Sequence, residues 1–160
     1  MRRMRDAHGV RRPLLAAAAA ALACGAATSA AAPPVALLTG VRAQPAKVTF
    51  TFRSAPSQIK AGYVTKAQLR EDGSGRPVAV KGKAFVVVHF TPASGGDLSG
   101  STFKLVYRGP KRLKPAAKGP VQEVVRTGDF EAVLSWAIGL DKRRPFHVVR
   151  TGANVVVAVG

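Results

Sequence analysis

The sequence has 160 residues, with 25 lysines and arginines against eight acids and a formal net charge of +17. This length accommodates one domain once a processing segment is set aside, and it leaves no room for a second core. The single cysteine, Cys24, excludes an internal disulfide and a zinc site built from several thiolates. The composition therefore indicates one small, strongly basic domain that depends on its hydrophobic core for stability.

The first 32 residues have the order of a secretory signal segment. A basic stretch (MRRMRDAHGVRR) precedes an apolar run from Leu14 to Cys24, and small residues (GAATSAAA) follow. The run of about 11 residues is shorter than the roughly 20 that span a bilayer, which favours a cleaved signal over an anchor. We expect cleavage near Ala30 or Ala31 and a domain at 33–160 that is exported to the envelope or the extracellular space.

Two more specific interpretations of this segment stay open beside an ordinary signal peptide. Arg11 and Arg12, followed by Pro13, resemble a twin-arginine signal, which exports folded domains. Cys24 resembles the lipidated cysteine of a bacterial lipoprotein, with the leucine of the motif one place too late at Leu22. Lipidation at Cys24 would anchor the domain to a membrane. In the alternative, Cys24 is an inert apolar residue that is removed with the segment.

After residue 32 the hydrophobic pattern is that of β-strands. Lys47 to Arg53 alternates strictly, with a valine and two phenylalanines on one face and threonines on the other. No segment after residue 35 has a helical period, and glycine-containing turns recur about every ten residues. The predicted strands are Ala36 to Arg42, Lys47 to Arg53, Gln58 to Thr65, Ala84 to Thr91, Phe103 to Tyr107, Val121 to Thr127, Glu131 to Ile138, Phe146 to Arg150 and Asn154 to Val159.

Many short strands with regular turns predict an all-β fold. One polar face per strand favours a β-sandwich of two antiparallel sheets over a barrel. The segment from Arg108 to Pro120 has three prolines and five basic side chains, and we expect it to form an irregular exposed loop. The predicted architecture is thus a signal segment followed by one β-sandwich.

Three stretches of the domain resemble the same family: LLTGVR, EDGSGRPVAVKGKAFVVVHFTPA and VQEVVRTGDFEAVLSWAIGLDKRRPFHVV. They are similar to the AMIN-like domain of actinobacterial secreted proteins and lipoproteins, a relative of the AMIN domain of cell-wall amidases. The resemblance runs from about Leu37 to Val159. It implies a β-sandwich without known catalysis and, from the AMIN relatives, targeting to the envelope through peptidoglycan. After LLTGVR only AQPAK stands where the family has a longer stretch with a Gly-Phe-Asp-Arg element, so a binding edge formed by that element would be altered here.

The sequence offers few groups for catalysis or metal binding. His89 and His147 are the histidines of the domain, and both alternate with apolar residues, which predicts partly buried positions in strands. The sequence has no HExxH, CxxC or Gly-x-Ser-x-Gly motif, and its DGSG turn lacks the Gly-Lys-Ser/Thr ending of a phosphate loop. We therefore expect no catalytic residue, no metal ion and no cofactor.

Two carboxylates and several aromatic residues are further candidates for a site. Asp129 and Glu131 would point the same way if a strand began at Asp129, as a glycosidase pair does, but surface acids in salt bridges are the favoured interpretation. Trp136 is predicted to lie in the core, with a sugar-stacking platform as the alternative. The other aromatic residues that an exposed face would offer are Phe130, Tyr63 and Tyr107.

Basic residues in two loops are the best functional clue of the composition, because together they would attract polyanions. Lys118 lies in the first loop, near Lys111, Arg112 and Lys114. Lys142 lies in the second loop, beside Arg143 and Arg144. Nucleic acid is not expected as a partner, since an exported domain rarely meets it and no recognition motif is present. We predict a noncatalytic cell-envelope module that binds an anionic cell-wall polymer or peptidoglycan through Lys111, Arg112, Lys114, Arg143 and Arg144. The alternatives are a module that binds an envelope protein through a free strand edge or an apolar sheet face, and a wall hydrolase.

Overall fold

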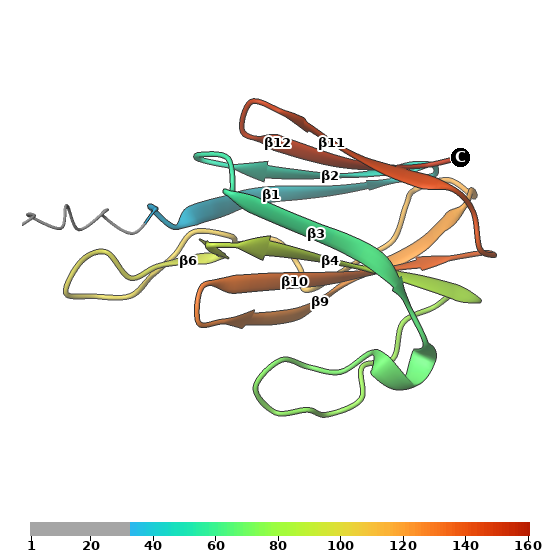
Figure 1. The fold of residues 1–160 in the computed structure, drawn as a ribbon, viewed down its shortest axis with the longest axis horizontal. Helices are drawn as coiled ribbons and strands as arrows, with labels where there is room; N and C mark the ends of the chain where they lie inside the picture. The colour runs from blue at the N-terminus through green and yellow to red at the C-terminus, as the bar shows by residue number, and fades with distance from the viewer. Residues whose placement is uncertain (1–32) are drawn as a thin grey trace, which may run out of the picture. The chain divides into compact units, whose positions relative to one another are not determined.

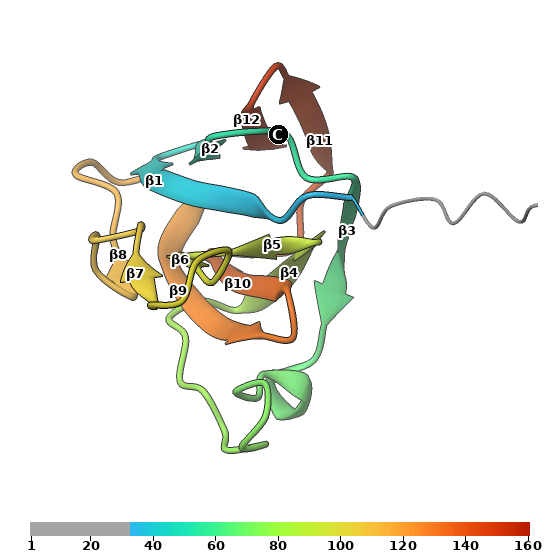
Figure 2. The same cartoon turned by 90° about the vertical axis from the view of Figure 1, so that its left-hand side faces the viewer.

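Two β-sheets pack face to face in residues 33–160, the part of the chain that the computed structural model describes (Figures 1 and 2). One sheet has the order β11 (Phe146–Thr151), β12 (Asn154–Val159), β2 (Lys47–Phe52), β1 (Ala36–Gln44) and β5 (Ala93–Ser94). The other has the order β3 (Gln58–Val64), β4 (Ala84–Thr91), β10 (Val133–Leu140), β9 (Val121–Phe130) and β8 (Arg112–Leu113). The predicted all-β fold of two sheets is confirmed.

Neighbouring strands of the two sheets run antiparallel, except that β1 pairs with β5 in parallel at Ala36 and Leu37. Every strand pair and both hydrophobic clusters of the described residues lie within 33–160, which form a compact unit. This part has a complete core and is expected to fold without the preceding residues. No helix within it is long and apolar enough to cross a bilayer. The signal segment, the twin-arginine pattern and Cys24 lie outside the described residues.

The core lies between the two sheets. It includes the side chains of β2 that the strict alternation of this strand predicts to face inward. Phe50 and Phe52 are buried, and the ring of Phe50 lies 4.9 Å from that of Phe90, measured between centroids. Trp136 has no exposed surface and contacts Phe50 edge-on, at a centroid distance of 5.8 Å. The predicted core position of Trp136 is confirmed, and its indole ring is not accessible to a sugar.

Residues 65–83, which we call the flap, cover the outer face of the second sheet (Figure 2). Leu69 and Val80 of the flap pack on Phe85 and Val87 in a hydrophobic cluster separate from the main core. The expectation of one polar face per strand is therefore wrong for β4, where Phe85–Val88 are all buried. The physical reason is that this run is apolar on both faces, so it is stable only where a second layer covers it.

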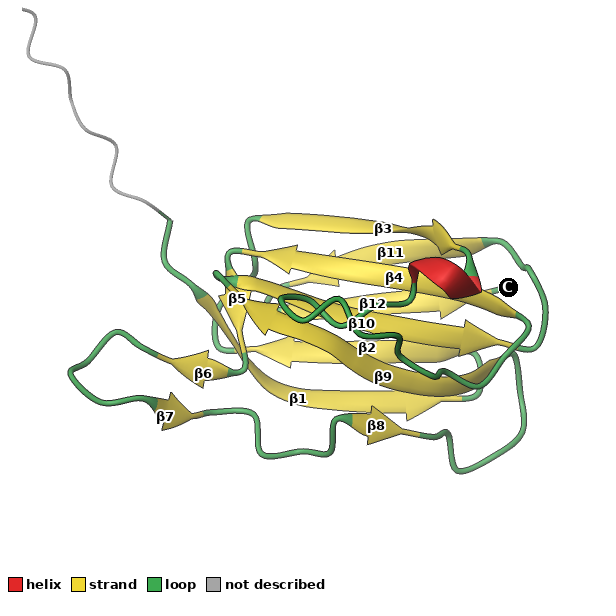
Figure 3. Cartoon of the chain, turned by 90° about the horizontal axis from the view of Figure 1, so that it is seen from below, coloured by secondary structure: helices red, strands yellow, loops and turns green. Residues whose placement is uncertain are grey.

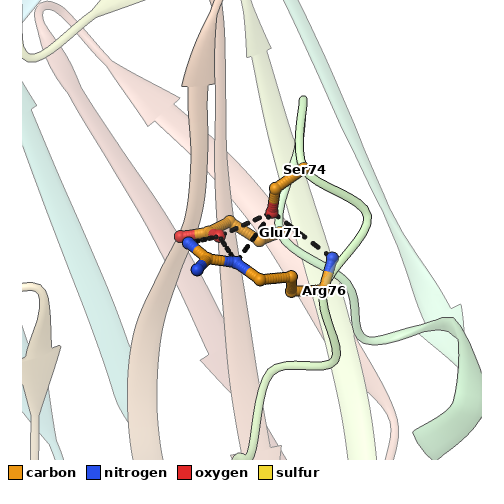
Figure 4. Close-up of polar contacts among 3 residues, drawn as sticks. All are labelled: Glu71, Ser74 and Arg76. Carbon is orange, nitrogen blue, oxygen red and sulfur yellow. Dashed lines mark hydrogen bonds and ion pairs between the residues drawn. The ribbon is translucent and has the colours of Figure 1, made fainter.

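The EDGSGRP stretch forms a tight turn at the tip of the flap (Figure 4). The Ser74 hydroxyl and the Arg76 guanidinium both donate to Glu71 Oε2, at 2.7 and 2.8 Å. The hydrogen bond from Ser74, followed by that from Arg76, lowers the pKa of Glu71. Gly73 and Gly75 have φ values of +82° and +66°, a region that suits glycine. This motif of the sequence thus shapes the flap.

The strand predicted at 103–107 is reduced to β7 (Lys104–Leu105), which pairs with β6 (Gly96–Asp97) in a hairpin outside the two sheets (Figure 3). Tyr107 turns into the core, is 3% exposed, and donates its hydroxyl to the carbonyl of Pro110 at 2.9 Å. The prediction that Tyr107 belongs to an exposed face is therefore wrong. Burial of its large ring against Trp136 outweighs continuation of the strand.

The segment from Arg108 to Pro120 is not irregular throughout, because it contains β8, which pairs with β9 through Arg112–Val125 and Leu113–Val124. Leu113 packs against the main core. The segment is therefore held to the second sheet at one point and exposed on either side of it. The proline and lysine content hid this pairing, since only one apolar side chain marks it.

The hairpin of β9 and β10 is closed by Glu131 and Ala132, with φ values of +50° and +58°, as in a type I′ turn. The predicted start of this strand at Glu131 is wrong, because β10 begins at Val133. Glu131 lies in the turn and does not share a strand face with Asp129. Asp129 forms the expected salt bridge, with its carboxylate 3.6 Å from the guanidinium of Arg126.

Candidate functional site

Two loops that carry basic residues meet at the end of the sandwich where the C-terminus lies, on the right of Figure 1. They are segment 114–120, before β9, and segment 141–145, between β10 and β11. The backbone N–H of Asp141 donates to the carbonyl of Pro120 at 2.9 Å, which joins the two segments. We call this surface the basic end. The cationic side chains that line its grooves are Lys66, Lys83, Lys114, Lys118, Lys142, Arg143 and Arg144.

A first groove, with a volume of about 630 Å³, lies between the two segments and is called the Lys114 groove. Lys114, Lys118 and Arg144 line it together with one carboxylate, Asp141. The Arg144 guanidinium donates two hydrogen bonds to Asp141, at 2.9 and 2.8 Å. These bonds hold the pKa of Asp141 at about 2, so its carboxylate is ionised at neutral pH. It offsets the charge of Arg144 and leaves Lys114 and Lys118 as the uncompensated cations of this groove.

A second groove, of about 580 Å³, lies between the end of β3 and the start of β4 and is called the Tyr63 groove. Its charged lining consists of three lysines and one arginine: Lys66, Lys83, Lys142 and Arg143. Among residues 33–160, no carboxylate side chain lines it. The Tyr63 groove is therefore the most uniformly cationic hollow of the basic end.

Tyr63 fixes the loop that carries the arginines. Its hydroxyl donates to the carbonyl of Arg144 at 2.6 Å and accepts from the Arg144 N–H at 2.9 Å. The ring contacts Phe146 edge-on, and the guanidinium of Arg143 lies over the ring, 4.1 Å from its centroid. A cation placed over an aromatic face is attracted to it, so Tyr63 also orients Arg143.

A shallow hollow joins the two grooves. Tyr63, Arg143, Arg144, Pro145 and Phe146 line it. It shares Arg144 with the Lys114 groove, and Arg143 and Tyr63 with the Tyr63 groove. The three hollows thus adjoin one another through shared lining residues across the basic end, and we call them together the track.

The five residues predicted from the sequence to bind a ligand fall into two groups. Lys114, Arg143 and Arg144 lie at the basic end, where the fold brings the two loops together. Lys111 and Arg112 line neither of its grooves. The charge cluster expected from the sequence is therefore divided by the pairing of β8 with β9.

Arg112 holds the flap in place. Its guanidinium donates to the buried carboxylate of Glu123 at 2.6 Å and to the carbonyl of Ala79 at 2.9 Å. Glu123 also accepts from the backbone N–H of Lys81 at 2.8 Å, and its side chain is 1% exposed. Because Ala79 and Lys81 belong to the flap, Arg112 and Glu123 fasten the flap to the second sheet.

Sequence reasoning missed Lys66, Lys83 and the role of Tyr63. These residues come from β3 and from the two ends of the flap, some 60 to 80 positions before Arg143 in the sequence. The Lys-Gly-Lys at 81–83, directly before a long strand, is a local signal that marks this edge. No local feature of the sequence links this edge to the loop that carries Arg143 and Arg144.

The two histidines occupy different environments. His89 is partly buried on β4, as predicted, with Nδ1 2.8 Å from Ser135 Oγ. His147 is exposed on β11, so its predicted partial burial is wrong. It points away from the core because Phe146 and Val148 take the inward positions of this strand. Within residues 33–160, no group of three or more His, Cys, Asp or Glu side chains is arranged to hold a metal ion.

A family model for the AMIN-like domain matches residues 36–160, from the first residue of β1 to the last residue of the chain. The chain belongs to the AMIN-like family. The match covers both sheets of this AMIN-like domain, its flap and its basic end. By analogy with the family, the domain is a module of the cell envelope associated with the cell wall, and the family suggests a module without catalysis. Neither the curated proteins nor the solved structures contain a significant match to the chain.

Proposed function

We propose that this AMIN-like domain is a noncatalytic module that binds an anionic polymer of the cell wall through its basic end. The observation that carries the proposal is the track, in which the Lys114 groove, the Tyr63 groove and the hollow between them share cationic lining residues. Asp141 is the one carboxylate side chain among the residues that line it. An extended cationic track suits a chain of many anions better than one small anion, because each further contact adds to the attraction.

The proposed contacts are Lys114, Lys118, Arg143 and Arg144. Lysine is a compact point charge on a flexible stem, and arginine offers a planar fork of donors, so the track accepts anionic groups in several geometries. Residues after position 32 also carry 20 bases against seven acids, which attracts a polyanion from a distance. Binding of this kind weakens as salt screens the charges.

For the hydrolase alternative, Asp129 and Glu131 line one hollow of the described residues together with Asp97, but the Asp129 carboxylate already accepts from the backbone N–H of Gly95. The Ser135 hydroxyl beside His89 belongs to a residue with no exposed surface. Asp129 is engaged by Arg126, and Glu131 lies in a turn. These placements support a module that binds without bond cleavage.

In its strand-addition form, the protein-interaction alternative requires a strand edge that is open to pairing. β3 and β11 are edge strands of the two sheets. On β11, the exposed Arg150 follows Phe146 and Val148 at alternate positions, and its guanidinium donates to the carbonyl oxygen of Pro56 at 3.4 Å. A charged side chain on an edge strand disfavours addition of another strand. This observation favours polymer binding over strand addition.

The test is sedimentation of the chain from residue 33 with purified cell walls. Replacement of Lys114, Lys118 and Arg143 by glutamine is expected to lower retention about tenfold at 50 mM NaCl, because three contacts of the track are lost. The matched control replaces Lys60, Lys104 and Arg108, which removes the same charge from exposed positions outside the track. Equal losses in the two triple variants, or retention that is unchanged in 0.5 M NaCl, would contradict the proposal.

A further inference from the structure

The Tyr63 groove concentrates more uncompensated positive charge than any other hollow of the basic end. Lys66, Lys83, Lys142 and Arg143 line it without a carboxylate side chain, whereas Asp141 offsets Arg144 in the Lys114 groove. Four like charges around one groove repel each other, so the site is stabilised most by a ligand that brings several negative charges. The groove thus selects for a ligand of high and uniform negative charge.

One face of the aromatic ring of this groove is already occupied and is not free to stack on a sugar. One face of Tyr63 carries the Arg143 guanidinium at 4.1 Å, and Phe146 contacts the ring edge-on at a centroid distance of 5.5 Å. The hydroxyl is engaged by the backbone of Arg144 as donor and as acceptor. Tyr63 therefore positions Arg143 and leaves recognition to the charged groups.

Resting on the proposed function, we propose that the Tyr63 groove holds the phosphodiester groups of a linear wall polymer and distinguishes them by charge, irrespective of the sugar or polyol between them. Lys66 and Lys83 are the binding residues that this assignment adds to the proposed contacts. Lys142 and Arg143 complete the cationic lining of the groove.

The chemistry of the two kinds of wall anion favours phosphodiesters. A phosphodiester carries a full negative charge at neutral pH, and its oxygens accept from the fork of Arg143 and from lysine ammonium groups. The peptides of peptidoglycan carry amines as well as carboxylates, so their net charge is small. A groove lined by four cations repels those amines.

The experiment compares three probes with the chain from residue 33. They are whole cell walls, the same walls after removal of their phosphate polymers with hydrofluoric acid, and a synthetic glycerol phosphate oligomer in solution. Removal of the phosphate polymers is expected to lower retention about tenfold, because the groove loses its ligand. A ribitol phosphate oligomer is expected to bind within about twofold of the glycerol phosphate oligomer, since the groove contacts the charges and not the polyol.

The variant for this test replaces Lys66 and Lys83 by glutamine, and the control replaces Lys60 and Lys104. Loss of the two groove lysines is expected to weaken oligomer binding about tenfold at 50 mM NaCl and to leave the residual binding to stripped walls unchanged. The slope of log K against log salt should become shallower by roughly 0.7 per contact, the value for a flexible single-stranded polyanion. The near-ultraviolet signal of the buried Trp136 verifies that each variant is folded.

The outcomes separate this inference from the function on which it rests. Failure to bind both whole and stripped walls contradicts the proposed function itself. Equal retention on whole and stripped walls overturns the phosphodiester assignment and leaves wall binding intact. An unchanged affinity of the Lys66 and Lys83 variant for the oligomer overturns the assignment of the groove.

Discussion

Asp141 determines how much of the positive charge at the basic end is free to meet a ligand. Its carboxylate accepts two hydrogen bonds from the Arg144 guanidinium, and it lines the same groove as Lys114 and Lys118. The pKa of about 2 that results, chiefly from the bonds with Arg144, keeps this carboxylate charged at every physiological pH. Asp141 therefore has two opposing effects. It orders the loop that carries Arg144, and it weakens the attraction of the groove for polyanions.

Replacement of Asp141 by asparagine is expected to raise the retention of the domain on cell walls about two- to threefold at low salt, because one negative charge leaves the track. It should also change the response of stability to acid. The folded state lowers the pKa of this carboxyl below its ordinary value of 3.8, so its contribution to stability is complete above about pH 4 and is lost as the pH falls through about 2.

The measurement for this variant is thermal unfolding at pH 5 and pH 2.5, with wall retention at pH 7. The difference in melting temperature between the two pH values should be smaller in the Asp141→Asn variant than in the parent. Lower wall retention by the Asp141→Asn variant would contradict this expectation. It would show that the order Asp141 gives to the loop with Arg143 and Arg144 matters more for binding than the positive charge it offsets.

At the scale of elements, the flap is the feature that distinguishes this sandwich from two bare sheets. Its apolar residues Leu69 and Val80 cover β4, and Arg112 with Glu123 fastens its second half. The carboxylate of Glu123 is buried, whereas the side chain of Arg112 is 46% exposed. Removal of the arginine therefore leaves a buried charge without its partner, which costs more than the loss of a surface ion pair.

Replacement of Arg112 by glutamine is expected to lower the free energy of unfolding by about 1–3 kcal/mol, because the buried Glu123 loses a charged hydrogen-bond partner. Wall binding by the folded fraction should be unchanged, since Arg112 does not line the track. Urea denaturation gives the stability, and sedimentation at a temperature where both proteins are folded gives the binding.

A second variant separates structure from charge at this position. Arg112→Gln combined with Glu123→Gln should recover part of the lost stability, because the unpaired buried charge is gone. A specific loss of wall binding in the stable double variant would instead place Arg112 among the ligand contacts that the sequence predicted.

At the scale of the whole molecule, one aromatic centre joins the sheets that carry the track. Phe50 contacts Phe90 and Trp136 across the interface, and all three are fully buried. The β3 edge that holds Tyr63 and the β11 start that holds Phe146 come from different sheets. The shape of the basic end therefore depends on how the sheets pack.

Truncation of Phe50 to alanine is expected to cost about 3–5 kcal/mol of unfolding free energy, since it opens a cavity in the centre of the core. Wall retention should fall in proportion to the unfolded fraction. The control is Val149→Ser on β11, where the side chain is 50% exposed and the expected change is within about 0.5 kcal/mol. Urea titrations of both variants give the two values, and similar values would contradict the assignment of Phe50 to the core.

Elements that depend on local periodicity could be predicted from the sequence. The bounds of β4 and β12 agree with the predicted Ala84 to Thr91 and Asn154 to Val159, and the inward face of β2 follows its alternation. The strand around Tyr107 was predicted wrongly, because burial of the tyrosine ring ends it early. The start of β10 was predicted wrongly, because Glu131 and Ala132 form a two-residue turn.

The sequence by itself determined the all-β class, the core face of the clearest strand, the excess of positive charge and the resemblance to the AMIN-like family. All of these depend on composition or on residues within a few positions of each other. Only the tertiary structure decided which charges are free. It paired Arg112 with Glu123, offset Arg144 with Asp141, and placed Lys66 and Lys83 beside Arg143. The physical reason is that side chains from separate strands become neighbours only through strand order and sheet packing, which no local pattern of residues encodes.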